Sequence, residues 1–320
     1  MKCLVTIDTE WDRRPEKSGN ITLENLAALP RFHSLFVQEG VRPCYFCSYE
    51  VAVSKDFFEF GRQIVKNNEG EIGSHLHPWS NPPYIHDEVT VRQRTPFPTE
   101  YPDDVFAEKL ILLRDELENR FGTQRSYRAG RYGFSESHAP LLMDAGYFVD
   151  SSITPFTSWQ RTNGWSPNAG PDFMDFDEYP FFFKSGTTEK HLLELPVTVS
   201  LPHNQLLTRV YRSGLMFRRI LHQTGFRPAW FRPFPGNLDQ LKRIVVQAKR
   251  HDLPVLNLMM HSNEFCHHTN PYFDTESKVD NLLNSLKSLF SFLRAENTEF
   301  LTPYEYYALA KNSSLREVEI

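Results

Sequence analysis

The amino-acid sequence predicts an α/β protein with a parallel sheet, folded as one domain over residues 1–320. Two observations predict this class. Short apolar runs alternate about seven times with amphipathic helical segments, which is typical of β-α-β units. Ionisable residues follow the ends of several of these runs, and in a parallel α/β barrel the carboxyl ends of the strands form one face. No internal repeat and no linker divides the chain.

The strands are predicted from short apolar or β-branched runs that turn residues bound. The first run, Cys3 to Ile7, reads as a strand buried on both faces. The predicted strands are residues 2–8, 43–48, 71–73, 126–129, 146–149, 192–199 and 254–260. The third is expected to end in a Gly-Ser turn that leads into His75 and His77.

The helices are predicted from apolar residues that recur with a period near 3.6. In the first one Thr22 is expected to form the N-terminal cap, and Pro30 is expected to kink it. The predicted helices are residues 22–38, 55–67, 104–121, 135–145, 204–223, 238–251 and 276–296. Two proline-rich segments without a period, 78–102 and 153–189, are expected to form long loops at the carboxyl-terminal face, and loops of that length are usually functional or disordered.

The composition is that of an ordinary globular protein. The chain is 40 % apolar and 23 % charged, and its net charge of −5 disfavours non-specific binding to nucleic acid or to an anionic membrane. No apolar run approaches the ~20 residues of a membrane span. Because a strand opens the sequence with no leader before it, we expect a cytoplasmic protein. Four cysteines form no disulfide framework in a chain of this length.

An acidic cluster follows the first strand. If the backbone stays extended, Asp8, Glu10 and Asp12 lie on one face, because side chains alternate with period two. Three carboxylates on one face repel one another unless a cation or an arginine lies among them. This cluster therefore indicates a site, and a solvated acidic turn is the alternative.

His75 and His77 follow the third strand. Neutral imidazole is the commonest protein ligand for metals, and a period of two aims both rings the same way at a strand end. In the alternative, one ring packs in the core and the other is solvated. If the chain turns at Leu76, His77 faces substrate or solvent instead.

Further polar residues follow the later strands. They are Arg128, Arg131, Asp150, Glu194 and His261. Arg128 pairing with a structural carboxylate and His261 packing in the core are the alternatives to functional roles. For Asp150 and Glu194 a structural role outweighs a catalytic one. Aromatic residues are abundant in the loops, where they either pack or line a groove that suits the face of a sugar.

These motifs resemble those of the polysaccharide deacetylase family, carbohydrate esterase family four. Asp8-x-Glu10 resembles its first motif, Arg128-Ala-Gly-Arg-Tyr-Gly its third, and Leu-Met-Met-His261 its fifth. Asp150-Ser-Ser corresponds loosely to the fourth. The second motif usually reads H-x-x-x-H, whereas this chain has His75-x-His77 with a tryptophan, Trp79, at the usual second position. The similarity runs in order from residue 3 to about residue 265.

The resemblance implies a distorted (β/α)7 barrel similar to a TIM barrel. It also implies a metal-dependent hydrolase that removes an acetyl group from an N-acetylated sugar of a cell-surface polysaccharide or its precursor. Asp8 would be the base, Arg128 would orient it, and His261 would be the general acid. Glu10, His75 and His77 would hold a divalent metal, with zinc favoured over cobalt, nickel or iron. The substrate-binding residues expected are Trp79, Arg131, Tyr132 and Asp150.

Two other functions stay open. One is hydrolysis of a non-sugar C–N bond, such as a ureide, on the same scaffold. The other is metal-free glycan binding without catalysis, which the shortened histidine spacing keeps open. In each case the expected partner is a small molecule or a glycan, and neither nucleic acid nor a membrane span is expected.

Overall fold

The central strand of the molecule is the first one, β1 (Lys2–Thr9), which is buried from Cys3 onwards. It pairs in parallel with β10 (Val255–His261) on one side and with β2 (Cys44–Cys47) on the other. In this computed structural model, which describes residues 1–12, 21–85, 95–185 and 191–320, Asp8 stands directly opposite His261. Residues far apart in the sequence therefore meet at the carboxyl ends of these strands.

The sheet is mostly parallel, as the sequence predicts. Its strands follow the order β10-β1-β2-β3-β4-β5-β7-β6-β12. The remaining bounds are β3 (Glu71–Leu76), β4 (Ser126–Ala129), β5 (Val149–Asp150), β6 (Phe181–Lys184), β7 (His191–Glu194), β11 (Glu299–Phe300) and β12 (Glu317–Glu319). β6 runs antiparallel to β7 and was not predicted, and β11 pairs with β1.

The segment after β7 links the two sides of the sheet. It contains β8 (Val199–Ser200), which pairs with β9 (Ala229–Trp230). The backbone N–H of Thr198 donates to Asn257 of β10 at 3.4 Å, and the N–H of Met259 donates to Phe231 at 3.2 Å. Residues around β9 are thereby brought against β10, where His261 lies.

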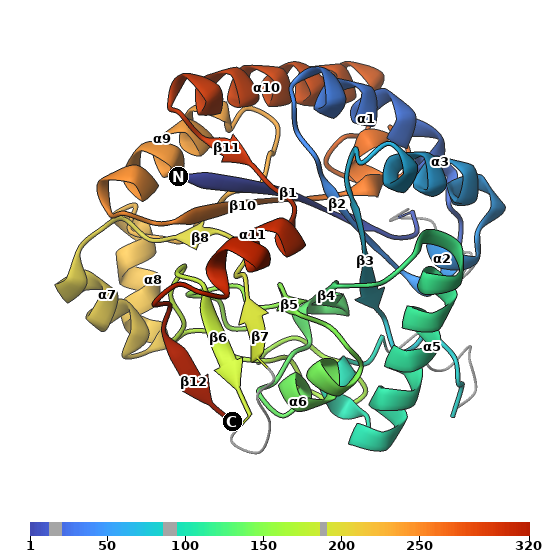
Figure 1. Ribbon diagram of the computed structural model, residues 1–320. Coiled ribbons are helices and arrows are strands. Elements are labelled where there is room, and N and C mark those ends of the chain that lie inside the picture. Colours follow the sequence, from blue (N-terminus) through green and yellow to red (C-terminus); the bar gives the residue numbers. More distant parts are fainter. Residues whose placement is uncertain (13–20, 86–94, 186–190) are drawn as a thin grey trace.

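Helices surround the sheet in Figure 1. Their bounds are α1 (Leu29–Gln38), α2 (Tyr49–Val53), α3 (Lys55–Lys66), α5 (Asp103–Phe121), α6 (His138–Asp144), α7 (Gln205–Arg212), α8 (Leu215–Gln223), α9 (Leu238–Arg250), α10 (Glu276–Ala295) and α11 (Pro303–Ala310). Short 3₁₀ helices are η1 (Glu24–Ala28), η2 (Pro98–Glu100), η3 (Gly130–Tyr132) and η4 (Ser262–Phe265). Among the described residues, no helix is both long enough and apolar enough to cross a bilayer.

Several predicted elements differ in detail. The strand expected over 192–199 is divided into β7 and β8. The helix expected over 22–38 is split into η1 and α1, because Pro30 lies in the first turn of α1, where its missing N–H removes no helical hydrogen bond. The helix expected over 204–223 is split into α7 and α8 at Ser213-Gly214. The expected turn at Gly73-Ser74 is wrong, since both residues lie inside β3. Residues 86–94 and 186–189 of the two expected loops lie outside the described residues.

Candidate metal and catalytic site

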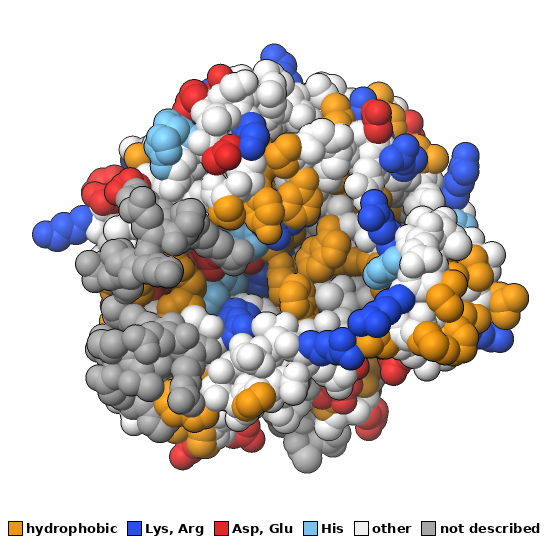
Figure 2. Space-filling model, turned by 180° about the vertical axis from the view of Figure 1, so that it is seen from behind, with side chains coloured by type: hydrophobic (Ala, Val, Ile, Leu, Met, Phe, Trp, Pro, Cys, Tyr) orange, Lys and Arg blue, Asp and Glu red, His pale blue; other side chains and the backbone are white. Residues whose placement is uncertain are grey.

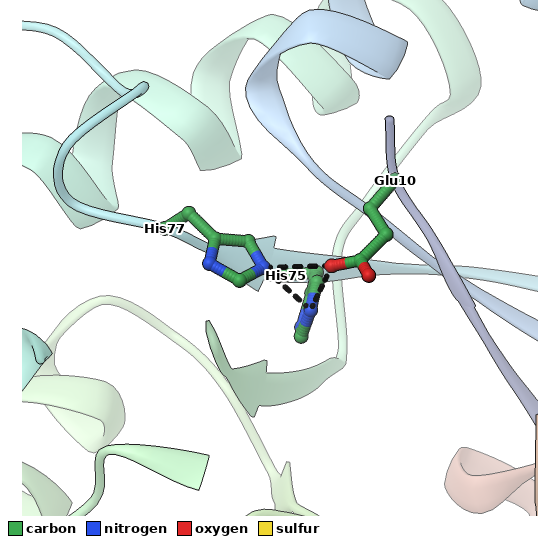
Figure 3. Close-up of side chains that lie close together, drawn as sticks. All are labelled: Glu10, His75 and His77. Atoms are coloured by element: carbon green, nitrogen blue, oxygen red, sulfur yellow. Dashed lines mark hydrogen bonds and ion pairs between the residues drawn. The ribbon is translucent and has the colours of Figure 1, made fainter. Parts of the chain in front are cut away.

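Glu10, His75 and His77 bring three potential metal ligands together at the carboxyl ends of β1 and β3 (Figure 3). Nε2 of His77 lies 2.9 Å from Oε2 of Glu10 and 3.0 Å from Nε2 of His75. Nε2 of His75 lies 3.6 Å from the same Glu10 oxygen. All three side chains are buried. Because β3 extends to Leu76, the alternation along the strand directs both imidazoles to the same side.

The tautomer of His75 is fixed by the backbone. Its Nδ1 lies 3.0 Å from the carbonyl oxygen of Arg128, its partner in the β3–β4 register. A carbonyl oxygen only accepts, so Nδ1 carries the hydrogen and the lone pair of Nε2 faces Glu10 and His77. Such an outer hydrogen bond is the usual way in which proteins orient a histidine that binds a metal.

Gly130 makes room for His77. A Cβ atom at position 130 would lie 2.5 Å from Nδ1 of His77 and 2.6 Å from the carbonyl oxygen of Leu76. Any side chain there would therefore push the imidazole or the strand end aside. No pattern in the sequence predicts this role, and the structure shows that the missing side chain leaves room for the imidazole.

The arrangement fits a divalent cation. Ligand atoms that surround zinc tetrahedrally at roughly 2.0–2.2 Å lie roughly 3.3–3.6 Å from one another. The separations here are 3.6 Å for one pair and the slightly shorter 2.9 and 3.0 Å for the other two. One carboxylate and two imidazoles suit zinc, cobalt, nickel or iron. Burial alone would lower the pKa of His75, but the carboxylates of Asp8 and Glu10 outweigh it and raise that pKa. The site thus favours positive charge.

Asp8 is held by a fully buried arginine. Nη1 of Arg128 donates to Oδ1 of Asp8 at 2.6 Å, and its Nη2 donates to Thr6 and to the hydroxyl of Ser151. The other Asp8 oxygen, Oδ2, lies 4.0 Å from Nε2 of His75 and 3.8 Å from Nε2 of His261. Burial would raise the pKa of Asp8, but Arg128 in particular outweighs it and keeps that pKa below its usual value. Asp8 is therefore an oriented carboxylate beside the three ligand atoms.

His261 is held by two residues that the sequence did not single out for the site, Arg232 and Glu264. Nη2 of Arg232 lies 2.9 Å from Nδ1 of His261, and Nε of Arg232 donates to Oε1 of Glu264 at 3.1 Å. The second Glu264 oxygen accepts from the backbone N–H of His261 at 3.1 Å. Burial would raise the pKa of Glu264, but Arg232 and His261 outweigh it and bring the pKa to about 2.

The Arg232 contact determines the tautomer of neutral His261. A guanidinium has donors and no acceptor, so Nδ1 of His261 accepts and Nε2 carries the hydrogen. Nε2 faces Oδ2 of Asp8 and Oε1 of Glu10, each at 3.8 Å. His261 thus presents an N–H to the space that Asp8 and Glu10 border.

The expectation that Asp12 shares this face is wrong. Its Oδ2 accepts from the backbone N–H of Glu24 at 2.9 Å, and its Oδ1 accepts from the N–H of Asn25 at 3.0 Å. Asp12 therefore caps η1, in place of the expected cap Thr22. The extended geometry ends with β1 at Thr9, so the alternation does not continue to position 12.

Two of the four predicted substrate-binding residues lie among aromatic rings. The buried ring of Trp79 lies 4.5 Å from Trp11 and 5.2 Å from His77. Tyr132 stacks on Trp159 at 5.7 Å, and Trp230 lies 6.0 Å from Tyr132. Tyr132 has a positive φ of 58°, a sparsely populated conformation for a residue with a side chain. Tyr132 directly follows Arg131, and Trp230 lies two residues before Arg232.

The other two, Arg131 and Asp150, are placed outside the cluster around Glu10. Arg131 donates to the carbonyl oxygen of Thr95 and, at 2.8 Å, to that of Asn163, so it ties two loops together. Asp150 is fully buried, accepts from Ser152, and lies beside Glu194. Burial raises the pKa of both carboxyls. Substrate contact by these two residues stays a prediction.

Figure 2 shows a hollow on the face opposite to that of Figure 1, with acidic, histidine and basic side chains inside it.

Comparison with known proteins gives structural matches only, since no protein-family model and no curated protein matches the sequence. A candidate polysaccharide deacetylase from Mycobacterium smegmatis superposes with a TM-score of 0.58 at 15 % identity, covering 100 % of this chain and 93 % of the other. The chain has the polysaccharide deacetylase fold.

The same fold also occurs in an enzyme of another name. A 4-alpha-glucanotransferase from Thermococcus litoralis superposes with a TM-score of 0.55 at 12 % identity, covering 100 % of this chain and 42 % of that enzyme. A polysaccharide deacetylase fold therefore does not by itself select a reaction. The reaction depends on the side chains at the ends of β1, β3, β4 and β10.

Proposed function

We propose that this protein is a metal-dependent hydrolase that removes an acetyl group from an N-acetylated sugar, in a cell-surface polysaccharide or its precursor. One observation carries the proposal. Three ligand atoms, from Glu10, His75 and His77, lie beside an arginine-held carboxylate, Asp8, and a histidine N–H, from His261. Amide hydrolysis needs a water nucleophile, a stabilised oxyanion and a proton for the leaving amine, and this set of groups meets all three needs.

The ligand set comes from Glu10, His75 and His77. A divalent cation held there supplies Lewis-acid chemistry, which polarises an acyl carbonyl and lowers the pKa of a water molecule. The two-residue histidine spacing is compatible with this role, because both Nε2 atoms lie within 3.6 Å of one Glu10 oxygen. We therefore favour catalysis over metal-free glycan binding.

Asp8 is the proposed base. Arg128 occupies its Oδ1, so Oδ2 is the oxygen that faces His75 and His261 and accepts a proton from water. The lowered pKa keeps the carboxylate ionised at neutral pH. A proton transfer of this kind contributes roughly 10²–10⁴-fold to the rate.

His261 is the proposed acid. Its Nε2–H faces Asp8 and Glu10, so the proton lies across the site from the strand that carries the two histidine ligands. It passes to the nitrogen of the leaving amine as the C–N bond breaks. The ring, whose Nδ1 is held by the Arg232 cation, then recovers a proton at Nε2 from Asp8, which took one from water and lies 3.8 Å away. Arg232 and Glu264 hold the ring so that this nitrogen, and not Nδ1, is the one that donates.

The aromatic rings support a sugar over a ureide. Trp159 and Trp230 are half-buried and flank Tyr132, and Trp230 is two residues from Arg232, which contacts His261. Flat apolar surfaces with a polar edge suit the face of a pyranose. A small, strongly polar ureide has no comparable apolar face to stack on these three rings.

The test is acetate release from N-acetylhexosamine oligomers by the purified protein loaded with zinc or cobalt. We expect release by the wild type and none by Asp8→Asn, which is nearly isosteric and leaves the ligand set in place. If the protein binds metal but releases acetate from no sugar, the proposed substrate would instead be a non-sugar C–N bond. Failure to take up any metal would leave glycan binding as the function.

A further inference from the structure

The segment 195–238 differs in charge from the rest of the chain. It holds six arginines and not one of the 40 aspartates and glutamates, although the net charge of the chain is −5. The arginines are Arg209, Arg212, Arg218, Arg219, Arg227 and Arg232. A repulsion from anionic surfaces that is expected from the net charge therefore does not apply to this part of the molecule.

Helices α7 and α8 form a hairpin within this segment, defined here as residues 205–223. Its inner side chains, Tyr211 and Leu221, pack with Phe226 in a small apolar cluster of their own. Arg212 fastens the hairpin to the segment between β5 and β6 by donating to the carbonyl oxygens of Met174 at 3.0 Å and of Phe176 at 3.1 Å. The inner side of the α7–α8 hairpin is thus packed against the rest of the molecule and hydrogen-bonded to it.

That outer side is unusually apolar. Its exposed fractions are 70 % for Leu206, 68 % for Met216, 54 % for Ile220, 44 % for Phe217 and 38 % for Leu215. Isolated exposed hydrophobic residues are common, but several within one short hairpin mark an interaction site. The outer side of the α7–α8 hairpin is therefore expected to bind a partner that has an apolar layer.

Exposed arginines accompany these apolar residues. Arg209 on α7, Arg219 on α8 and Arg227 just beyond α8 are all exposed. Within the described part of the chain, none of the three forms an ion pair. Guanidinium groups bind phosphate with two parallel hydrogen bonds, so the occupant is expected to carry phosphate next to its apolar layer.

We propose that the α7–α8 hairpin docks on the surface of a bilayer that contains anionic phospholipid. Leu206, Met216 and Ile220 reach the boundary between headgroups and acyl chains, while the arginines pair with phosphates. A nucleic acid would match the arginines but leave the apolar side chains in water. An uncharged lipid surface would match the apolar side chains and leave the arginines without partners.

The hairpin is continuous with the catalytic site. The chain that leaves α8 reaches Trp230, which lies beside Tyr132, and then Arg232, which contacts His261. In Figure 1 α7 and α8 lie at the left edge, so in the reversed view of Figure 2 they lie at the right edge, where apolar and basic side chains gather near the hollow. Docking would bring the mouth of the site close to the bilayer, whatever reaction the site performs.

Flotation with vesicles tests the proposal. The full chain is mixed with vesicles of phosphatidylcholine alone or of phosphatidylcholine with phosphatidylglycerol, at low and at high salt. We expect flotation with the phosphatidylglycerol vesicles at low salt and little with phosphatidylcholine alone. The double variants Met216→Ser/Ile220→Ser and Arg209→Gln/Arg219→Gln should each lower the bound fraction at least tenfold.

Matched variants on other helices serve as controls. Val37→Ser/Val65→Ser removes two apolar side chains that are 43 % and 42 % exposed, and Arg62→Gln/Arg250→Gln removes two exposed charges. These controls should bind vesicles as the wild type does, and all variants should keep the wild-type melting temperature.

The proposal would be overturned if the wild type does not float with any vesicles, or if both hairpin variants bind vesicles as well as the wild type does. Dimerisation that Met216→Ser/Ile220→Ser abolishes, without any vesicle binding, would overturn it in favour of a second copy.

Discussion

Nη2 of Arg232 lies 2.9 Å from Nδ1 of His261, and the same guanidinium pairs with Glu264, three residues after that histidine. Because Arg232 can only donate, this contact places the hydrogen of neutral His261 on Nε2, the nitrogen that faces Asp8 and Glu10. An element remote in sequence from β10 therefore decides which nitrogen of the proposed acid can give a proton.

Replacement of Arg232 and Glu264 should slow the reaction without weakening substrate binding. The variant Arg232→Met/Glu264→Gln removes both charges together, so it leaves no unpaired buried carboxylate. We expect kcat to fall roughly tenfold or more, up to the 10²–10⁴-fold that a positioned proton donor contributes, and KM to stay the same. Unchanged kcat in a folded variant would contradict this role, with Arg250→Met as the control.

Gly130→Ala should weaken metal binding while the protein stays folded. Its Cβ would lie 2.5 Å from Nδ1 of His77, so the imidazole has to shift from the position in which its Nε2 faces Glu10. Disturbed support of a metal ligand typically lowers affinity roughly 10–100-fold, which a competition titration with a zinc indicator measures. Gly214→Ala is the matched control, since no atom lies within 4 Å of a Cβ there and it should bind zinc as the wild type does. Equal affinities of the two variants would show that the space at Gly130 does not serve His77.

Loss of Arg128 should destabilise the protein chiefly through Asp8. Arg128→Met leaves a buried carboxylate unpaired, which typically lowers the free energy of unfolding by about 3–5 kcal/mol. The double variant Asp8→Asn/Arg128→Met removes that charge as well and should recover part of the loss. Urea unfolding of the wild type, both single variants and the double variant measures the coupling. Additive losses would contradict a direct energetic link between the two residues.

Stability should fall in mild acid because of His138. This residue is buried, its ring stacks on Phe106 at 4.1 Å, and burial lowers its pKa to about 4. The unfolded chain takes up the proton near the ordinary pKa of about 6.5, so stability is lost as pH falls from there towards 4. At pH 5 the loss from this residue is about 2 kcal/mol. His138→Phe should lose correspondingly less stability than the wild type between pH 7 and pH 5, and parallel curves would contradict this assignment.

The predictable part of the fold and site follows from local patterns. Short apolar runs that alternate with helical segments predict the strands. Because these strands are parallel, residues such as Asp8, His75 and Arg128 come to one edge of the sheet. The convergence of Glu10 with His75 needs only that geometry, because Glu10 directly follows β1 and His75 lies at the end of β3. These residues could therefore be found before the structure.

The features of the site that the sequence does not predict depend on contacts between segments that no sequence pattern relates to one another. Arg232 lies after a two-residue strand in an irregular segment, and only hydrogen bonding of that segment to β10 brings it to His261. Asp12 continues the acidic spacing of Asp8 and Glu10 but caps η1, because β1 has already ended. The role of Gly130 is set by the width of an imidazole from another strand, which no pattern within its own loop records.

The central claim is that Glu10, His75 and His77 bind one divalent metal ion. Titration of the chelator-treated protein with zinc, followed calorimetrically, tests it most directly. We expect one equivalent to bind to the wild type, with binding lost or weakened by orders of magnitude in Glu10→Gln, His75→Ala and His77→Ala, and retained in His138→Phe. Failure of the wild type to bind zinc, cobalt or nickel, or full binding by His77→Ala, would contradict the account.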